Sequence, residues 1–284
     1  MFLPCSVYVL TSVPTFSNSD EDNWPKNGEI DIVEGVNYQV AAKTALHTSE
    51  SCSMYAHSPS YAFTGEFDRA TGLPDTFTGI PATETSVPAD NCWNLAPHQW
   101  ANQGCVIQAE RNDTIGQPLN EQGGGVYALE WDPANGYIKS WVFPSADDSS
   151  SSFPDNLRNT IETAGAKNAK DRILPEPSSW GLPYAYFAIG DRSGCSADHF
   201  KNMRIVFNLA FCGTVAGNRF FRDCPLLANK FNVSGDPVES CNAYIKSEPK
   251  ELEEAYWKIR GVYVYEREYG KPTVVDDEEQ EIKG

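Results

Sequence analysis

The sequence is poor in positive charge, in histidine and in long apolar runs. Lysine and arginine number 22 against 39 acidic residues, a formal net charge of -17, so a phosphate backbone would be repelled and nucleic acid is excluded as a partner. With four histidines and no cysteine pair at CxxC spacing, the usual zinc patterns are absent, and we predict no metal site. No run of about 18 apolar residues occurs, so we expect no membrane-spanning segment. No serine stands in a GxSxG context, which leaves a serine hydrolase without support.

The cysteines are even in number and scattered, and two N-glycosylation sequons accompany them, Asn112-Asp113-Thr114 and Asn232-Val233-Ser234. This combination predicts disulfides and an oxidising compartment, hence a secreted, extracellular or cell-wall protein. Met1 to Ser17 is partly apolar, but Pro4 and Pro14 interrupt it and no basic segment precedes it, so no clear signal peptide is formed. The eight cysteines are Cys5, Cys52, Cys92, Cys105, Cys195, Cys212, Cys224 and Cys241.

Short apolar or alternating runs, separated by Gly, Pro, Asn and Ser clusters, dominate the chain, while helical periodicity is rare. No βαβ alternation occurs, so an all-β sandwich or barrel is favoured. The best helix candidate is Pro249–Trp257, with Ser247 as its cap. Residues 269–284 are acidic and poor in large apolar groups, and we expect a disordered tail there. The predicted strands are Glu29–Val36, Thr44–His47, Val126–Trp131, Ile138–Phe143, Met203–Phe211 and Val262–Glu266.

The stretch Glu29-Ile30-Asp31-Ile32-Val33-Glu34 carries the strongest chemical signal. Side chains alternate between faces along a regular strand, so Glu29 and Asp31 share a face and Glu34 falls on the other one. A β-bulge near Ile32-Val33 inserts one extra residue and would return Glu34 to the face of the other two acids. The spacing therefore predicts three carboxylates on one bulged strand face.

Carboxylates that share a strand face repel one another, which raises the proton affinity of at least one of them. A glycosidase needs such a set, because one carboxylate must be ionised while another is protonated at the same pH. The alternatives are a solvated acidic strand face and a site for a hard cation. The strand by itself leaves these alternatives open.

The stretch Trp24-Pro25-Lys26-Asn27-Gly28-Glu29-Ile30-Asp31-Ile32-Val33-Glu34-Gly35-Val36-Asn37 closely resembles the active-site strand of glycoside hydrolase family 16. Within that family it is similar to the fungal endo-β-1,3(4)-glucanases, or laminarinases. Further matches follow in order, and the resemblance covers about residues 4–266. They are Leu46–Ser49, Gly124–Trp131, Ser140–Pro144, Pro177–Gly181, His199–Asn202, Phe207–Gly213 and Glu254–Tyr265.

The resemblance implies a β-jelly-roll sandwich, concanavalin A-like, of two curved antiparallel sheets with an open cleft. It implies Glu29 as nucleophile, Glu34 as general acid/base and Asp31 as the assisting carboxylate. It implies no cofactor, and a β-glucan polysaccharide or oligosaccharide as the partner of a monomeric catalytic domain over residues 1–268.

The family carries a much longer stretch ahead of its catalytic strand than this chain does. Pro4-Cys5-Ser6-Val7-Tyr8 resembles a piece that normally lies deep inside the domain. We therefore expect an N-terminally truncated domain that lacks some strands and exposes unpaired strand edges. Tyr8, Val9 and Leu10 stand where cleft aromatics are expected, which bears on substrate affinity.

Five residues are candidates for substrate contact: Trp24, Asn37, His47, Glu130 and Trp131. Trp24 could stack on a sugar ring, or pack at the rim of the core. Trp131, preceded by Glu130, follows a strand that resembles the family, although core packing is the commoner role of a lone tryptophan. His47 could hydrogen-bond to a catalytic carboxylate or be purely structural. Asn37 could bind a sugar hydroxyl or be a turn residue.

The leading hypothesis is retaining endo-hydrolysis of β-1,3- or mixed-linkage β-1,3/1,4-glucan. A glucan-binding protein without turnover, or an inactive truncated form, is the first alternative. The presence of all three acids speaks against it, and the missing N-terminal strands speak for it. Glucan transglycosylation is the second, because sugar can intercept a covalent intermediate in place of water.

Overall fold

The computed structural model describes residues 7–12, 24–70, 87–145, 153–191, 193–267 and 269. The predicted strand Glu29–Val36 forms with those bounds, and each predicted strand up to Ile138–Phe143 falls on an observed one. The strands are β1 (Val7–Ser12), β2 (Glu29–Val36), β3 (Lys43–His47), β4 (Cys52–Ser53), β5 (Glu66–Phe67), β6 (Cys105–Gln108), β7 (Gly125–Asp132), β8 (Tyr137–Pro144), β9 (Ala185–Ala188), β10 (Gly194–Cys195) and β11 (Asn208–Phe211).

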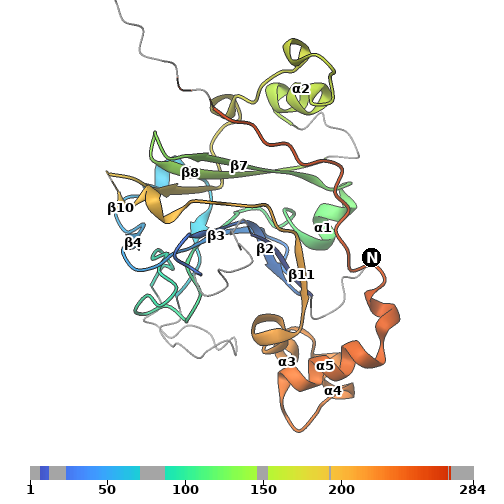
Figure 1. Cartoon of the computed structure of the whole chain (residues 1–284). Helices are drawn as coiled ribbons and strands as arrows, with labels where there is room; N and C mark the ends of the chain where they lie inside the picture. Colours follow the sequence, from blue (N-terminus) through green and yellow to red (C-terminus); the bar gives the residue numbers. More distant parts are fainter. Residues whose placement is uncertain are drawn as a thin grey trace, which may run out of the picture.

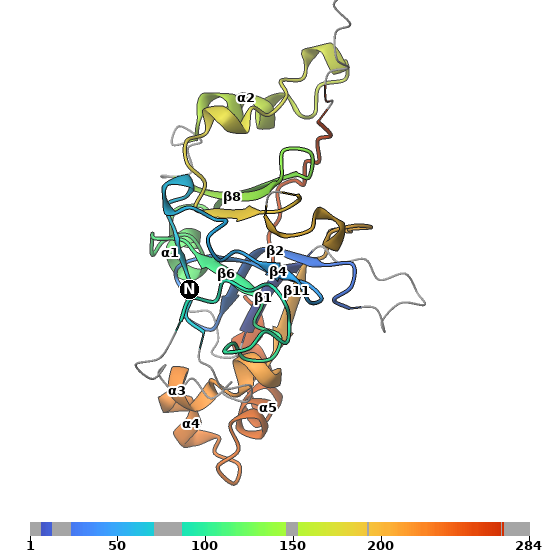
Figure 2. The same ribbon diagram turned by 90° about the vertical axis from the view of Figure 1, so that its left-hand side faces the viewer.

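The strands form antiparallel sheets in two layers. A six-stranded sheet has the order β11-β1-β2-β3-β6-β5, a three-stranded sheet the order β7-β8-β9, and β10 pairs with β4. Figures 1 and 2 both show β7 and β8 lying over the sheet that contains β2. Strand β2 is therefore a central strand of the larger sheet, flanked by β1 and β3.

The two layers share one hydrophobic core. Ile30 of β2, Leu46 of β3 and Ile107 of β6 meet Ile138 of β8 and Phe187 of β9 in a single cluster. All five are at most 1% exposed. Because apolar burial is the main favourable term in folding, this cluster fixes which face of β2 turns inward. The opposite face of β2 is left for the acidic side chains.

Helices account for more of the chain than an all-β prediction allows. Asp236 accepts a hydrogen bond from Glu239 N at 2.9 Å and caps α5, with Pro237 in the first turn. Within the described ranges, no helix is long and apolar enough to cross a membrane. The α-helices are α1 (Gly116–Glu121), α2 (Asp155–Thr163), α3 (Phe220–Asp223), α4 (Pro225–Lys230) and α5 (Pro237–Ser247).

The predicted helix Pro249–Trp257 is wrong. Its proposed cap, Ser247, is the last residue of α5, and only a 3-10 turn over Pro249–Leu252 follows. Pro249 disfavours helical geometry at Glu248, which takes φ -125° and ψ 54°. The acidic run after Pro249 therefore marks the end of a helix and not the start of one.

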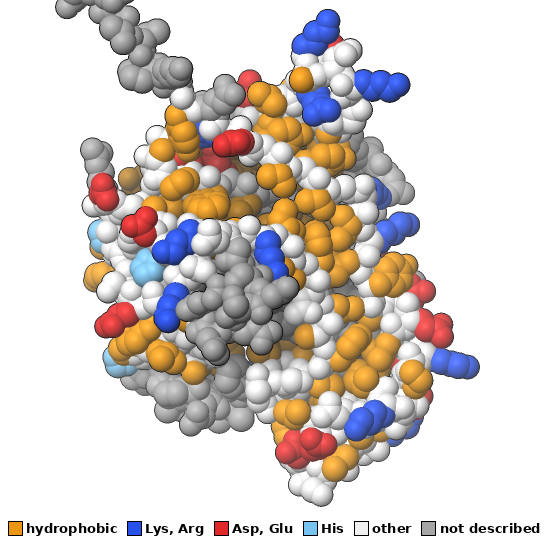
Figure 3. Space-filling view, in the orientation of Figure 1, with side chains coloured by type: hydrophobic (Ala, Val, Ile, Leu, Met, Phe, Trp, Pro, Cys, Tyr) orange, Lys and Arg blue, Asp and Glu red, His pale blue; other side chains and the backbone are white. Residues whose placement is uncertain are grey.

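The predicted closing strand Val262–Glu266 is not a strand in this structure, and the predicted strand Met203–Phe211 shortens to β11. Val262 and Val264 are exposed, and Figure 3 shows hydrophobic side chains gathered on the face that carries this segment. An extended segment forms a strand only where a neighbouring backbone accepts its hydrogen bonds, and no described strand pairs with this one.

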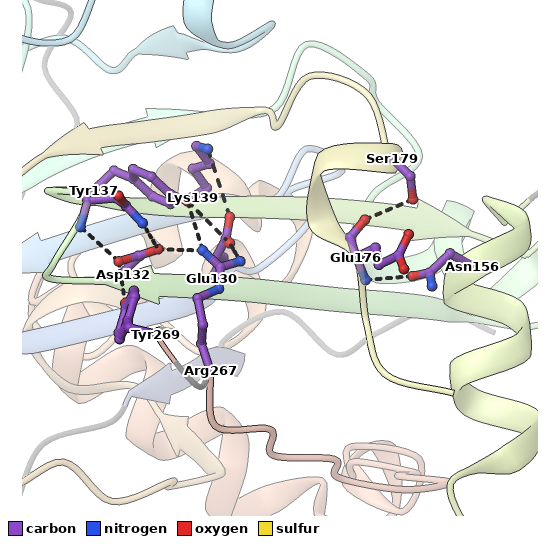
Figure 4. A network of polar contacts seen from close by, with 10 residues as sticks. Glu130, Asp132, Tyr137, Lys139, Asn156, Glu176, Ser179, Arg267 and Tyr269 are labelled. Atoms are coloured by element: carbon purple, nitrogen blue, oxygen red, sulfur yellow. Dashed lines mark hydrogen bonds and ion pairs between the residues drawn. The ribbon is translucent and has the colours of Figure 1, made fainter. Parts of the chain in front are cut away.

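The C-terminal segment is nevertheless held against β7. Arg267 forms ion pairs with Glu130 and Asp132, and the Tyr269 hydroxyl donates to Asp132 Oδ1 at 2.5 Å (Figure 4). Tyr269, which was predicted to begin a disordered tail, thus contacts the folded sheet. The rest of that predicted tail, residues 270–284, lies outside the described residues.

The predicted disulfides are confirmed. The described bridges are Cys52–Cys195, Cys92–Cys105 and Cys212–Cys241, and Cys224 is also disulfide-bonded. Cys52 and Cys195 belong to the core between the sheets and join β4 to β10, across a sequence separation of 143 residues. This bridge therefore closes by far the longest loop of the three.

Replacing both Cys52 and Cys195 with alanine is expected to lower the free energy of unfolding by about 2–5 kcal/mol, because the bridge restricts the unfolded chain. Urea unfolding followed by tryptophan fluorescence measures this loss. The paired alanine variant of Cys92 and Cys105, whose separation is 13 residues, serves as the comparison and should lose less. A larger loss from the shorter loop would contradict the argument.

Candidate active site on strand β2

The predicted bulge in β2 is present. Against β3 the register runs from Asp31 opposite Ala45 to Glu34 opposite Lys43, so three steps on β2 face two on β3. Against β1 the register also skips Ile32. Ile30 and Val33 are consequently both buried, each in a hydrophobic cluster, although three steps along the strand separate them and strict alternation would put them on opposite faces. The same shift places Glu34 on the face of Glu29 and Asp31, as predicted.

Two side chains hold the bulge, one from the neighbouring strand β3 and one from the residue before β9. Thr44 Oγ1 donates to the Ile32 carbonyl oxygen at 3.0 Å, and the Tyr184 hydroxyl lies 2.5 Å from Thr44 Oγ1 and 3.5 Å from the same carbonyl. Burial raises the pKa of Tyr184 well above its usual range, so its phenol stays protonated and able to donate. These hydroxyls satisfy a backbone oxygen that the bulge removes from the ladder.

Trp24 lies directly at the first carboxylate. Its indole Nε1 donates to Glu29 Oε2 at 2.6 Å, and its ring centroid is 6.1 Å from that of His47. A charge-assisted hydrogen bond of this kind fixes the orientation of the carboxylate. Trp24 therefore lies at the acidic cluster, where its observed contact is with Glu29.

Asp31 and His47 form a buried pair. His47 Nε2 lies 3.1 Å from Asp31 Oδ2, and Asp31 is 0% exposed. Burial, followed by the charges of Glu29 and Glu34, raises the pKa of Asp31 well above its ordinary value, although His47 opposes the rise. Burial disfavours the imidazolium, but Asp31 and the two glutamates outweigh that effect and raise the pKa of His47 to about 9. The cluster therefore retains protons at neutral pH.

One group of side chains could offer ligand atoms to a metal ion. Oxygen and nitrogen atoms of Glu29, Asp31 and His47 lie within 4.8 Å of one another. Two contacts favour a proton site over a cation site. The Trp24 indole directs a hydrogen atom at Glu29 Oε2, and His47 Nε2 faces the Asp31 carboxylate. Glu29 Oε2 is thus occupied by the Trp24 indole, and Asp31 Oδ2 lies against the His47 ring.

The conformation and contacts of Asn37 fit the structural alternative, a turn residue. It has φ 52°, a left-handed conformation that asparagine tolerates in turns. Its Nδ2 donates to Asp223 Oδ2 at 2.9 Å, and the side chain is buried. Asp223 also pairs with Arg219 at 2.8 Å. Asn37 therefore ties the end of β2 to helix α3.

The two candidates from β7 are not brought to the carboxylates. Leu129 packs into the core between the sheets, so by strand alternation Glu130 faces away from β2. There Glu130 pairs with Arg267 and Lys139 (Figure 4). Trp131, opposite Ile138 at the end of β7, is 37% exposed. The core and β2 itself separate both residues from the acidic face, so this placement speaks against their predicted contact with substrate.

Sequence reasoning missed several residues that support the site. Thr44 and Tyr184 are separated by 140 residues, and nothing in either local pattern indicates their contact. Gly104, behind His47, has φ +67° and belongs to a Gln-Gly-Cys stretch. A glycine just before Cys105 was the one available signal, because a left-handed position favours glycine.

The free energy of unfolding is expected to fall as pH rises from about 6.5 to 9. The folded pKa of His47 is about 9 against an ordinary 6.5, so the folded state binds this proton more tightly than the unfolded chain. The resulting contribution to the free energy of unfolding is on the order of 3 kcal/mol. It is fully present below pH 6.5 and is lost as the pH rises to about 9. Urea unfolding at pH 6, 7.5 and 9 measures it. His47→Gln should flatten the dependence of the unfolding free energy on pH. Parallel curves for variant and wild type would contradict the assignment of this pH dependence to His47.

Comparison with known proteins assigns the chain to a family. Residues 10–265 match the sequence model described as "XgeA-like, catalytic GH16 domain", so the chain belongs to glycoside hydrolase family 16, as predicted. The endo-1,3(4)-beta-glucanase xgeA of Emericella nidulans is 32% identical over 246 residues, which are 86% of this chain and 30% of that protein. An endo-1,3(4)-beta-glucanase of Arthroderma benhamiae is also 32% identical over 246 residues, 86% of this chain and 42% of that protein.

Solved structures of the same family resemble the fold. An elongating GH family 16 β-1,3-glucosyltransferase superimposes with a TM-score of 0.61 at 27% identity, over 90% of this chain and 66% of that one. Laminarinase 16A of Phanerochaete chrysosporium, solved with β-glucans in donor and acceptor sites, gives a TM-score of 0.56 at 27% identity and the same coverage. The chain thus spans less than half the length of the two curated relatives and 66% of these solved chains.

Proposed function

We propose that this chain is a catalytic domain that hydrolyses β-1,3-glucan or mixed β-1,3/1,4-glucan within the polymer, with retention of configuration. Glu29 attacks the anomeric carbon while Glu34 protonates the departing glycosidic oxygen. Water, deprotonated by Glu34, then breaks the glycosyl–Glu29 bond and leaves a new β-configured reducing end. Asp31 is the assisting carboxylate and acts through Glu29 and Glu34, because it lies between them on the same face.

One observation carries the proposal: the bulge at Ile32 gathers three carboxylates on one face and gives them different surroundings. Glu29 accepts an indole hydrogen bond, Asp31 is buried with a raised pKa, and Glu34 is half-buried. Acid and base roles in one site require carboxyl groups with separate proton affinities. The names of the relatives, endo-1,3(4)-beta-glucanases and a laminarinase with bound glucan, support the same chemistry.

The sandwich fold, the domain bounds, the location and the substrate-side residues are part of the same proposal. The two packed antiparallel sheets fit a jelly-roll sandwich, and residues 1–268 are taken as the catalytic domain of a monomer. The disulfides fit an extracellular or cell-wall location. Trp24 and His47 are the predicted substrate-side residues that lie at the acidic cluster, and a sugar ring would meet the half-buried Trp24 indole.

Proton NMR of laminarin during the first minutes of reaction tests the proposal. New reducing-end signals are expected in the β-anomeric form first, with the α-anomer growing later by mutarotation. Appearance of the α-anomer first would contradict the retaining roles of Glu29 and Glu34. Absence of new reducing ends with retained glucan binding would favour the non-catalytic alternative.

A second activity, transglycosylation, is favoured by the structural neighbour described as an elongating β-1,3-glucosyltransferase. In that reaction a sugar hydroxyl, deprotonated by Glu34, replaces water in the second step and forms a new glycosidic bond. Mass spectrometry of products from laminarihexaose at high substrate concentration distinguishes the two. Products longer than the substrate indicate transfer, and shorter ones alone indicate hydrolysis.

A further inference from the structure

His47 has one ring nitrogen that its partner Asp31 does not use. Nε2 lies 3.1 Å from Asp31 Oδ2, whereas the buried Nδ1 has no hydrogen-bond partner among the described residues. A functional imidazole is usually oriented by a hydrogen bond to its second nitrogen. Here some other contact must hold the ring against Asp31.

Gly104 supplies that contact. A Cβ at this position would lie 2.7 Å from His47 Nδ1, 3.0 Å from Cε1 and 2.3 Å from the Leu46 carbonyl oxygen. The distances to Nδ1 and to the Leu46 carbonyl oxygen are too short for a real Cβ atom, and the distance to Cε1 is very tight, so only glycine lets the backbone approach the ring this closely. The φ of +67° at Gly104 adds a second requirement for glycine. The backbone of Gly104 therefore forms the wall behind the imidazole.

The loop that carries Gly104 is fastened at several points. The Gln99 side chain, 5% exposed, donates from Nε2 to the Gly104 carbonyl at 2.7 Å and to the Asn91 carbonyl at 2.8 Å. Its Oε1 accepts from Asn91 N at 3.0 Å, and the Cys92–Cys105 disulfide closes the same loop. A loop fixed in this way can hold a ring in place by packing.

We propose that Gly104, braced by Gln99, is a positioning residue that sets the place of the His47 ring and through it the geometry of the carboxylate cluster. The proposal rests on the glucanase function proposed above. Gly104 touches no reacting atom and acts only through His47, which contacts Asp31 between Glu29 and Glu34. Displacing the ring by a fraction of an ångström would alter the orientation of Asp31, and rates are sensitive to such misplacement.

A double-mutant cycle on the full chain tests the proposal. Gly104→Ala is expected to lower kcat on laminarin about tenfold to a hundredfold with little change in KM. In a His47→Ala background the same substitution should change kcat less than about twofold, because the ring it would displace is gone. An undiminished effect in that background would overturn the proposal.

Gly136 offers a matched control. It has φ +79°, and a Cβ there would lie 2.6 Å from the Ile189 carbonyl oxygen, in the β7–β8 hairpin remote from the cluster. Gly136→Ala carries a similar backbone penalty and should leave kcat nearly unchanged at temperatures where both variants are folded. Equal losses of kcat in the two variants would reduce Gly104 to a general structural role and overturn the proposal.

Two further measurements keep the result decisive. If Gly104→Ala does not fold, Gln99→Leu removes the donor to the Gly104 carbonyl and is taken through the same cycle with the same expected outcomes. The NMR resonance of His47 Nε2–H reads the ring position without turnover, and it should move in Gly104→Ala but not in Gly136→Ala. If the wild type hydrolyses no glucan, the function proposed above fails, and an unmoved resonance would separately overturn the positioning role.

Discussion

Glu29→Gln is expected to lower kcat on laminarin about 10⁴-fold or more, because an amide cannot form the covalent glycosyl bond. The amide oxygen of glutamine can still accept the indole hydrogen bond that Trp24 gives Glu29, so the fold and glucan binding should persist. Reducing-end assays measure the rate, and isothermal titration with laminarihexaose measures binding. The large loss of rate with retained binding is the result that separates a nucleophile from a residue that only shapes the cleft.

Glu66→Gln is the matched control. Glu66 is an exposed glutamate on β5, at the far edge of the sheet that contains β2. The substitution removes the same charge and should leave kcat within about twofold, since exposed positions away from special features tolerate change. If Glu29→Gln loses no more activity than this control, the nucleophile lies elsewhere and the assignment of the acidic strand is wrong.

The acidic strand was predictable because its signal is local. Strand alternation and one inserted residue define where Glu29, Asp31 and Glu34 lie, and both depend only on neighbours in the sequence. The register against β1 and β3 then follows from burial of Ile30 and Val33. A one-residue slip would expose these two side chains, so the hydrophobic pattern and the bulge determine each other.

The supporting contacts of the site were not predictable, because they join distant segments. Tyr184, the residue before β9, contacts the bulge, and Gly104, in the loop before β6, contacts His47. For Glu130, by contrast, the sequence predicted a contact with substrate that the structure speaks against. Its sequence neighbours resemble a cleft strand, yet alternation along β7 turns its side chain outward to Arg267. Which face of a strand meets the cleft depends on how the sheets stack, and that depends on the whole core.

The helical parts were missed for a related reason. The signals for α5, an Asp-Pro start with Asp236 as cap, stand in the sequence, but the region lacks a strong apolar period. Its stability comes from tertiary packing, as Phe220 stacks on Tyr244 with ring centroids 6.0 Å apart, and from the Cys212–Cys241 bridge. Short helices depend on such packing more than on propensity.

Glu34→Gln is expected to lower kcat on laminarin about 10²- to 10⁴-fold, because the departing sugar alkoxide then leaves without a proton. An aryl β-laminaribioside with a dinitrophenolate leaving group needs no protonation, so its first step should proceed at close to the wild-type rate. The glycosyl–Glu29 intermediate would then accumulate, because no base activates water. Stopped-flow absorbance should record a burst of dinitrophenolate followed by a slow steady state.

Azide distinguishes a missing acid/base from a damaged site. As an anion it attacks the glycosyl–Glu29 intermediate without a base, so added azide should speed the slow phase of Glu34→Gln and yield a β-glycosyl azide. It should not rescue Glu29→Gln, which forms no such intermediate. Equal loss on laminarin and on the activated substrate, with no response to azide, would remove Glu34 from the acid/base role. The half-buried position of Glu34, beside the fully buried Asp31, is what an exchangeable acid/base requires, because it must reach both the leaving oxygen and incoming water.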